Sequence, residues 1–190
     1  QHSPCNFLAI KLSHALRFMR GDLKGMLRTT SEALSFWTPS TSGYGFVLGC
    51  HAFGLYEAGR YDLAERFGRR AIEHEPADAW ALHAVGHVFE MQGRVIEGAR
   101  WQEMSRPIWS KCNNFSFHMA WHLALFYLAQ NRMEEALALY DVQVRPTQTD
   151  DFRDVANAVS FLWRLRQEGF EVGDRWDGLV ELARKRATDT

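Results

Sequence analysis

The sequence predicts an all-α protein built from about five helical hairpins. Two observations support this fold class. Apolar residues recur at the three- and four-residue spacing of helices, and no segment has the convincing apolar–polar alternation of a strand. A short turn motif also returns at a nearly constant interval after successive apolar helices. Such a period is typical of repeated units that stack to bury a continuous core.

The repeated turn motif fixes the period. Gly59 and Gly93 each precede an arginine and lie 34 residues apart, and Asn131, also followed by arginine, comes 38 residues later. Gly21 is a weaker copy, 38 residues before Gly59. Two helices in a unit of about this length are the signature of tetratricopeptide repeats (TPRs). We therefore predict a right-handed TPR solenoid.

The individual elements follow from breakers and apolar spacing. We expect helices at residues 6–19, 23–36, 44–58, 61–75, 79–93, 114–127, 152–168 and 174–185. Repeats are placed at about 7–40, 45–78, 79–112 and 117–150 of a single domain spanning 1–190, with 151–187 as a capping hairpin. In the third repeat Gly98 and Gln102 depart from the consensus, so its second helix is expected to be degenerate.

Composition restricts the partners. The formal net charge is −1, which provides no basic field for nucleic acid or an anionic membrane. No apolar run is long enough for a transmembrane helix, and no signal peptide is visible. The three cysteines are widely spaced, which favours reduced thiols. We predict a cytoplasmic protein that binds neither nucleic acid nor membrane.

Two pairs of histidines are the strongest candidates for a functional site. His83 and His87 lie four residues apart on one predicted helix, and His118 and His122 on another. This spacing places each pair on one helix face. Because the two helices are the first helices of consecutive repeats, the pairs are expected to face one concave groove. The predicted groove residues are His51, Trp80, His83, His87, Glu90, His118, Trp121 and His122.

Three functions fit this pattern. TPR grooves commonly hold an extended peptide or a small ligand, with aromatic side chains supplying contact area, and this needs no cofactor. Imidazole is also the commonest ligand of zinc, so the four paired histidines with Glu90 as base fit a metal-dependent hydrolase. In the third alternative, the histidines are buried, form hydrogen bonds with one another and serve only as a structural polar ladder between helices. The sequence favours a binding protein over an enzyme.

Three segments resemble a known family. The runs Y-G-F-V-L-G-C-H-A-F-G-L-Y-E-A-G (residues 44–59), D-A-W-A-L-H-A-V-G-H-V-F-E-M-Q-G-R (78–94) and H-M-A-W-H-L-A-L-F (118–126) are similar to the tetratricopeptide repeat protein 38 family. The resemblance implies a TPR solenoid, of which this chain would be the carboxy-terminal half or a short relative, and it carries no settled activity. It includes the histidines and the acid at Glu90. Tyr56 and Met119 depart from it, since an acid and an asparagine are expected there.

Overall fold

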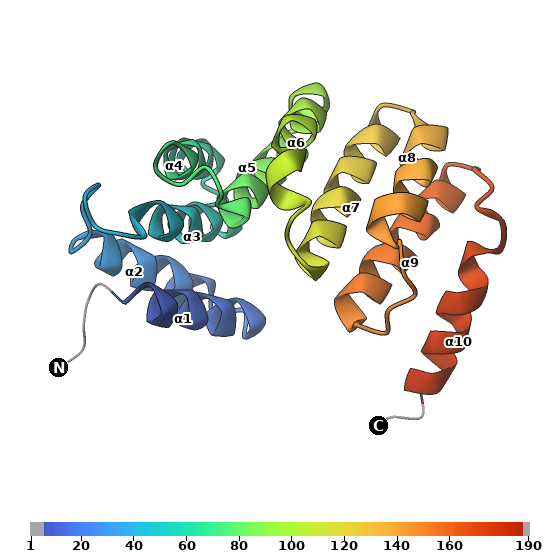
Figure 1. Ribbon diagram of the computed structural model, residues 1–190, viewed down its shortest axis with the longest axis horizontal. Helices are drawn as coiled ribbons and strands as arrows, with labels where there is room; N and C mark the ends of the chain where they lie inside the picture. The colour runs from blue at the N-terminus through green and yellow to red at the C-terminus, as the bar shows by residue number, and fades with distance from the viewer. Residues whose placement is uncertain (1–5, 188–190) are drawn as a thin grey trace. The chain divides into compact units, whose positions relative to one another are not determined.

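The computed structural model describes residues 6–187, and these residues form helices joined by short turns and loops (Figure 1). The predicted all-α fold is confirmed. The chain divides into two compact units, one ending at Arg94 and the other beginning at Val95. The first unit contains α1 (Phe7–Met19), α2 (Leu23–Leu34), α3 (Tyr44–Glu57), α4 (Tyr61–His74) and α5 (Ala79–Met91). The second contains α6 (Val95–Trp109), α7 (Asn114–Ala129), α8 (Met133–Leu139), the π-helix η1 (Tyr140–Val144), α9 (Phe152–Gln167), the 3-10 helix η2 (Gly173–Trp176) and α10 (Asp177–Arg186).

The repeated turn motif ends the first helix of each hairpin in the same way. At the end of α3, Gly59 has a φ of +72°, its N–H donates to the carbonyl of Tyr56, and the next N–H, of Arg60, donates back to Leu55. This is the Schellman arrangement, which needs a residue in the left-handed region. The same turn recurs at Gly21, Gly93, Asn131 and Gly169. Asn131 is the non-glycine residue there, and asparagine tolerates this conformation better than most.

Helix α3 is the centre of the first unit and packs against α1, α2, α4 and α5. Its small residues allow this close approach. A Cβ at Gly45 would lie 2.9 Å from the Ala71 carbonyl oxygen of α4, and Ala52 is fully buried. Phe53 and Leu48 fill the space between the helices. The glycines of this helix therefore lower its intrinsic helix propensity but allow the neighbouring helices to pack closely.

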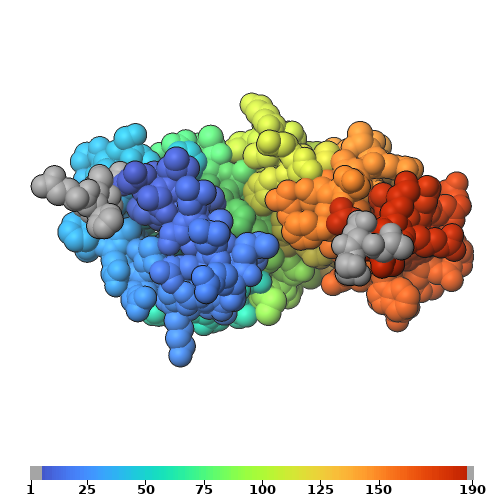
Figure 2. Space-filling model, turned by 90° about the horizontal axis from the view of Figure 1, so that it is seen from below, coloured from blue at the N-terminus to red at the C-terminus, as the bar shows by residue number. Residues whose placement is uncertain are grey.

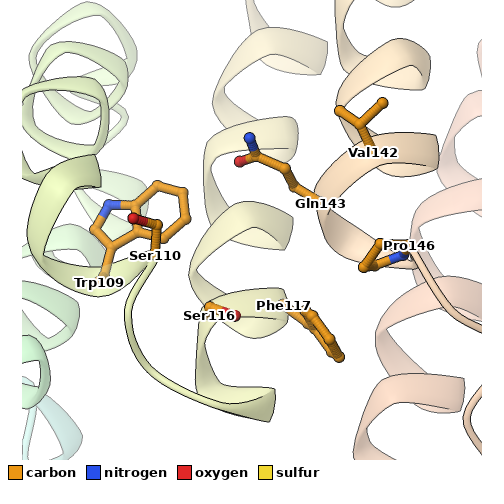
Figure 3. Close-up of a pocket in the computed structure, with 7 residues that line it drawn as sticks. All are labelled: Trp109, Ser110, Ser116, Phe117, Val142, Gln143 and Pro146. Carbon is orange, nitrogen blue, oxygen red and sulfur yellow. The ribbon is translucent and has the colours of Figure 1, made fainter.

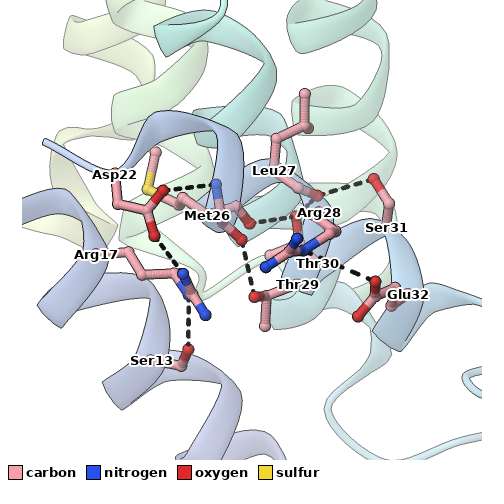
Figure 4. Close-up of polar contacts among 11 residues, drawn as sticks. Ser13, Arg17, Asp22, Met26, Leu27, Arg28, Thr29, Thr30, Ser31 and Glu32 are labelled. Carbon is pink, nitrogen blue, oxygen red and sulfur yellow. Dashed lines mark hydrogen bonds and ion pairs between the residues drawn. The ribbon is translucent and has the colours of Figure 1, made fainter.

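A polar cluster fixes the turn between α1 and α2 (Figure 4). The Oδ1 atom of Asp22 accepts a hydrogen bond of 2.9 Å from the Gly25 N–H, which caps α2. Its other oxygen pairs with Arg17 of α1, and Arg17 also donates to Ser13. The Gly25 N–H and the Arg17 guanidinium lower the pKa of the Asp22 carboxyl. One carboxylate thus links the end of the first helix to the start of the second.

Helix α1 lies at the surface of the first unit, where Figure 2 shows it in dark blue. One of its faces is apolar and open to solvent. Leu8, Leu12, Leu16 and Met19 are between 56% and 71% exposed. Their spacing of three and four residues places them on a single stripe, while Ile10 and His14 on the other side are buried. Only one face of α1 is thus used in the packing of this unit.

Helix α7 is the centre of the second unit and packs against α6, α8, η1 and α9. The second helix of the third repeat, α6, is complete despite its departure from the consensus. A Cβ at Gly98 would lie 2.3 Å from the ring of Phe126, so this glycine makes room for an aromatic side chain of α7. After α8 the chain continues as the π-helix η1, which the sequence pattern did not predict. Among residues 6–187, no helix is long and apolar enough to cross a membrane.

Candidate functional site

Helix α5 carries the first histidine pair and begins at a buried cap. The side chain of Asp78 is 4% exposed, and its Oδ1 accepts a hydrogen bond of 3.0 Å from the Trp80 N–H. Its Oδ2 has no hydrogen-bond partner. Burial raises the pKa of this carboxyl to about 6, although the nearby Lys11 opposes the shift. The cap fixes the start of the helix and thereby the direction in which Trp80 and the histidines point.

His83 and His87 contact each other directly. Their Nε2 atoms lie 2.8 Å apart, which is the distance of an N–H···N hydrogen bond. His83 is 3% exposed and His87 is half-buried. The predicted position of both histidines on one face of one helix is therefore seen in the structure, with the two rings turned toward a common point.

Aromatic side chains hold the rings of this pair. Phe53 of α3 stacks on His83 with 14° between the planes, and Tyr56 stacks on His87 with the centroids 4.6 Å apart. Trp80 lies beside His83 at 5.1 Å. Phe53 and Tyr56 were not predicted as site residues. Their one signal was the departure of Tyr56 from the family pattern, where an acid was expected.

Helix α1 adds two further residues to this region. The ammonium group of Lys11 lies 3.9 Å from the centre of the Trp80 ring, a cation–π contact. His14 is 2% exposed and neither of its ring nitrogens has a hydrogen-bond partner. Burial, helped by the charge of Lys11, lowers the pKa of His14 to about 3. His14 is therefore neutral at physiological pH and packs edge-on against Phe53 and Trp80.

The second pair, on α7, repeats the arrangement of the first. The Nε2 atoms of His118 and His122 lie 3.1 Å apart. His122 is 1% exposed, and burial, followed by the influence of His118, lowers its pKa well below the usual value. His118 is half-buried, and its Nδ1 lies 3.4 Å from the Oδ1 of Asn157 on α9. With this amide orientation, Nδ1 carries the proton, which leaves the Nε2 lone pair directed at His122.

Trp121 supports the second pair as Trp80 supports the first. Its ring stacks on His118 with 14° between the planes. The indole N–H donates to the Ser160 hydroxyl at 3.1 Å, and the Arg164 guanidinium lies 5.9 Å from the ring centre. Helix α9 therefore orients both the tryptophan and the histidine of α7. Asn157 and Ser160 were missed by sequence reasoning because nothing in the periodicity of α9 marks them.

The two remaining predicted residues, His51 and Glu90, have surroundings of their own. His51 of α3 is bonded through Nδ1 to the Thr30 hydroxyl at 3.0 Å, and its ring packs edge-on against Phe67 of α4. Burial lowers its pKa to about 4. Glu90 is exposed at the end of α5, and after burial and Glu57 it also contributes to raising the pKa of Tyr56. That both pairs face one groove involves both units and stays a prediction.

A separate pocket of about 260 Å³ lies in the second unit (Figure 3). It is lined by Trp109, Ser110, Ser116, Phe117, Val142, Gln143 and Pro146. The Oε1 atom of Gln143 is buried there without a hydrogen-bond partner. A π-helix has a wider turn than an α-helix, so η1 turns Val142 and Gln143 in directions that a continuing α8 would not give them. This explains why helical periodicity did not predict the pocket.

Comparison with known proteins identifies the fold class. No family model matches the sequence. By fold, the chain is a TPR-like repeat protein: it is similar to the nearly identical TPR-like repeats of a putative kinesin light chain from Podosopora anserina, with a TM-score of 0.71 and 11% identity over 99% of this chain and 100% of that one. It is also similar to MamA from Desulfovibrio magneticus RS-1, with a TM-score of 0.61 and 13% identity over 97% of each chain. At these identities the likeness concerns the fold alone.

Proposed function

We propose that this chain is a TPR-type binding module that holds a peptide or a small ligand against the histidine- and tryptophan-bearing faces of α5 and α7. The observation that carries this proposal is the common layout of the two helices. Each has a half-buried tryptophan in contact with an i, i+4 histidine pair. An aromatic side chain offers a large contact area at low cost in conformational entropy, and the imidazoles add hydrogen-bonding atoms.

The two tryptophans are fixed before any ligand arrives. Trp80 is held by Lys11 and by the His14 ring, and Trp121 by the Ser160 hydroxyl. Because the side chains are already ordered, a ligand loses less free energy in ordering them on binding. The proposal makes the two indole rings the principal contact surfaces, with the half-buried His87 and His118 beside them.

A metal-dependent hydrolase is the second candidate. It is favoured by the convergence of two imidazole nitrogens within each pair, at 2.8 Å and 3.1 Å. Glu90 would serve as the base in that mechanism, but it is exposed at the end of α5, one turn beyond His87. The binding module requires no reacting group at this position and is therefore the better supported function. A purely structural ladder is the remaining alternative.

We further propose that the chain is a relative of the tetratricopeptide repeat protein 38 family and acts in the cytoplasm. The resemblance rests on the three segments that include the histidine helices. Among them, the segment at residues 78–94 contains α5, its Asp78 cap and its closing turn at Gly93. The proposed partner is a peptide or a small molecule. A nucleic acid or a membrane is not proposed, because the formal net charge of −1 provides no basic field.

Selection from a phage-displayed library of short peptides tests the binding module. The immobilised chain is expected to enrich peptides that bind the wild type and lose at least about tenfold in affinity when Trp121 is replaced by alanine, since such an aromatic contact is a typical hot spot. Trp163→Ala is the matched control, because Trp163 is 59% exposed on α9. Selected peptides that bind both variants as well as the wild type would overturn the proposed surface, and a library that yields no binder would overturn the peptide as its ligand.

A further inference from the structure

We propose that each histidine pair, His83 with His87 and His118 with His122, is a two-nitrogen chelating site for a transition-metal ion of the zinc, nickel or copper class. This inference rests on the binding surface proposed for α5 and α7 but not on a peptide as its ligand. The inference concerns the kind of ligand that these histidines bind, a metal ion, and includes no catalytic step. The argument applies to each pair within its own unit.

The distances within each pair fit a shared ion. Zinc lies 2.0–2.1 Å from a histidine nitrogen, so two nitrogens on one tetrahedral ion are about 3.3 Å apart. The Nε2 atoms are 2.8 Å apart in the first pair and 3.1 Å in the second. An ion between the rings needs both Nε2 lone pairs, so the donating ring must carry its proton on Nδ1 instead and turn slightly to admit the ion. The same geometry is built twice, on two separate helices, from the same spacing of four residues.

The surroundings hold the rings as metal ligands are commonly held. A ligating histidine usually donates its second ring N–H to a carbonyl or a carboxylate, which sets the tautomer and the ring direction. The Nδ1 of His118 faces the Oδ1 of Asn157 at 3.4 Å. In the first pair the restraint is aromatic: Phe53 stacks on His83 and Tyr56 on His87. Each pair therefore presents its Nε2 atoms in a limited range of directions.

The ligand atoms select the class of ion. Each pair offers imidazole nitrogens and no carboxylate within the pair, and imidazole suits zinc, copper and nickel. Magnesium and calcium prefer oxygen ligands and are not expected to bind. An ion held by two nitrogens from one helix needs further ligands from water, from a bound molecule or from other side chains. A small molecule that binds metals, such as imidazole, is therefore expected to fill the remaining coordination positions of the ion.

Isothermal titration calorimetry of the full chain with Zn²⁺ and with Ni²⁺ tests the proposal. The wild type is expected to bind one or two ions per chain, and Mg²⁺ is expected to give no binding heat. The double variant His87→Ala/His118→Ala removes the half-buried ligand of each pair. It is expected to lower the affinity by more than the roughly 10- to 100-fold typical of losing a residue that only supports a ligand. The exposed His74 provides the matched control, since His74→Ala keeps both pairs intact.

Circular dichroism and a thermal melt of each variant accompany the titration. Zinc is expected to raise the midpoint of the wild type and of His74→Ala but not of the double variant, because an ion that binds only the folded state stabilises it. If the wild type binds no zinc or nickel, or if the folded double variant binds either ion as tightly as the wild type, the proposal is overturned. If the wild type binds no metal but still selects peptides, the metal proposal fails and the proposed binding module is supported. If it binds metal but selects no peptide, the metal proposal is supported and only the peptide is excluded as a ligand of the module.

Discussion

The Nε2 atoms of His83 and His87 lie 2.8 Å apart on α5 although His83 is almost completely buried. Two uncharged imidazoles can share one proton at this distance, with one nitrogen donating and the other accepting. The contact therefore satisfies the Nε2 atom of each ring in an apolar environment built by Phe53, Tyr56 and Trp80. Removing either ring leaves an imidazole nitrogen to find another partner.

Loss of the buried ring is expected to cost stability. His83→Ala removes the partner of His87 and opens a cavity beside Phe53, so the free energy of unfolding should fall by about 2–3 kcal/mol. Urea unfolding measures this change. His74→Ala removes only the edge-on contact of an exposed ring with Tyr44 and should change it by no more than about 1.5 kcal/mol. Equal effects of the two substitutions would show that the contact between the histidines contributes nothing measurable.

Replacing two glycines of α3 by alanine distinguishes the effect of close helix packing from the effect of helix propensity. At Gly45 a Cβ would lie 2.9 Å from the Ala71 carbonyl oxygen, and the α4 backbone cannot easily move away. Gly45→Ala should therefore destabilise the protein by about 1–3 kcal/mol. At Gly54 the nearest atom, the Leu27 Cα, is 3.5 Å away, which is an ordinary contact. Gly54→Ala should stabilise the protein by about 0.5–1 kcal/mol through helix propensity. Urea unfolding measures both variants. A higher urea midpoint for Gly45→Ala than for Gly54→Ala would contradict this account of the packing.

His51 should make the stability depend on pH. Its pKa is lowered to about 4 in the folded chain, from an ordinary value of 6.5. The unfolded chain therefore binds a proton more readily. The contribution to stability is complete above pH 6.5 and is lost as the pH falls from 6.5 toward 4. At pH 5 the loss of stability amounts to about 2 kcal/mol, since one pKa unit corresponds to about 1.4 kcal/mol.

The variant His51→Gln isolates this contribution. Glutamine retains a hydrogen-bonding group for the Thr30 hydroxyl but does not titrate, so urea unfolding between about pH 7.5 and pH 5 should show a smaller loss of stability than in the wild type. The remaining loss should come from other buried histidines, among them His14, whose pKa is lowered to about 3. Parallel pH profiles for wild type and His51→Gln would refute the assignment.

Asn157 is expected to act as a positioning residue for His118. Asn157→Ala removes the acceptor that faces the His118 Nδ1 and should lower zinc affinity by about tenfold. Asn157→Asp supplies a carboxylate acceptor at the same place and should restore the affinity. Calorimetric titration of the three proteins measures both effects. An aspartate variant that binds zinc no better than the alanine variant would assign Asn157 a role in helix packing only.

The fold was largely predictable because its signals are local. The left-handed turn residue at Gly59, Gly93 and Asn131 ends a first helix at each recurrence, so the sequence period corresponds to a repeated backbone conformation. Helix bounds agree closely: α3 was expected at residues 44–58 and extends over Tyr44–Glu57. The π-helix after α8 was missed because it changes the hydrogen-bond register without a breaker residue.

The candidate site was predictable only along single helices. The spacing of four residues places His83 beside His87 whatever the tertiary structure. In contrast, Tyr56 on α3 and Asn157 on α9 reach the pairs from other helices, and periodicity gives no information on such partners. His51 was grouped with the pairs on sequence position, whereas its ring bonds to Thr30 and packs on Phe67. The repeat pattern does not indicate that Thr30 of α2 would be the hydrogen-bond partner of His51.

Retention of zinc after gel filtration tests the central claim, that each histidine pair binds a transition-metal ion, most directly. The wild type and the double variant His83→Ala/His122→Ala are each incubated with excess zinc, passed through the column and examined by X-ray fluorescence, with folding confirmed by circular dichroism. The account predicts that the wild type retains zinc and that the folded variant does not. Equal zinc on both proteins, or none on the folded wild type, would contradict the account.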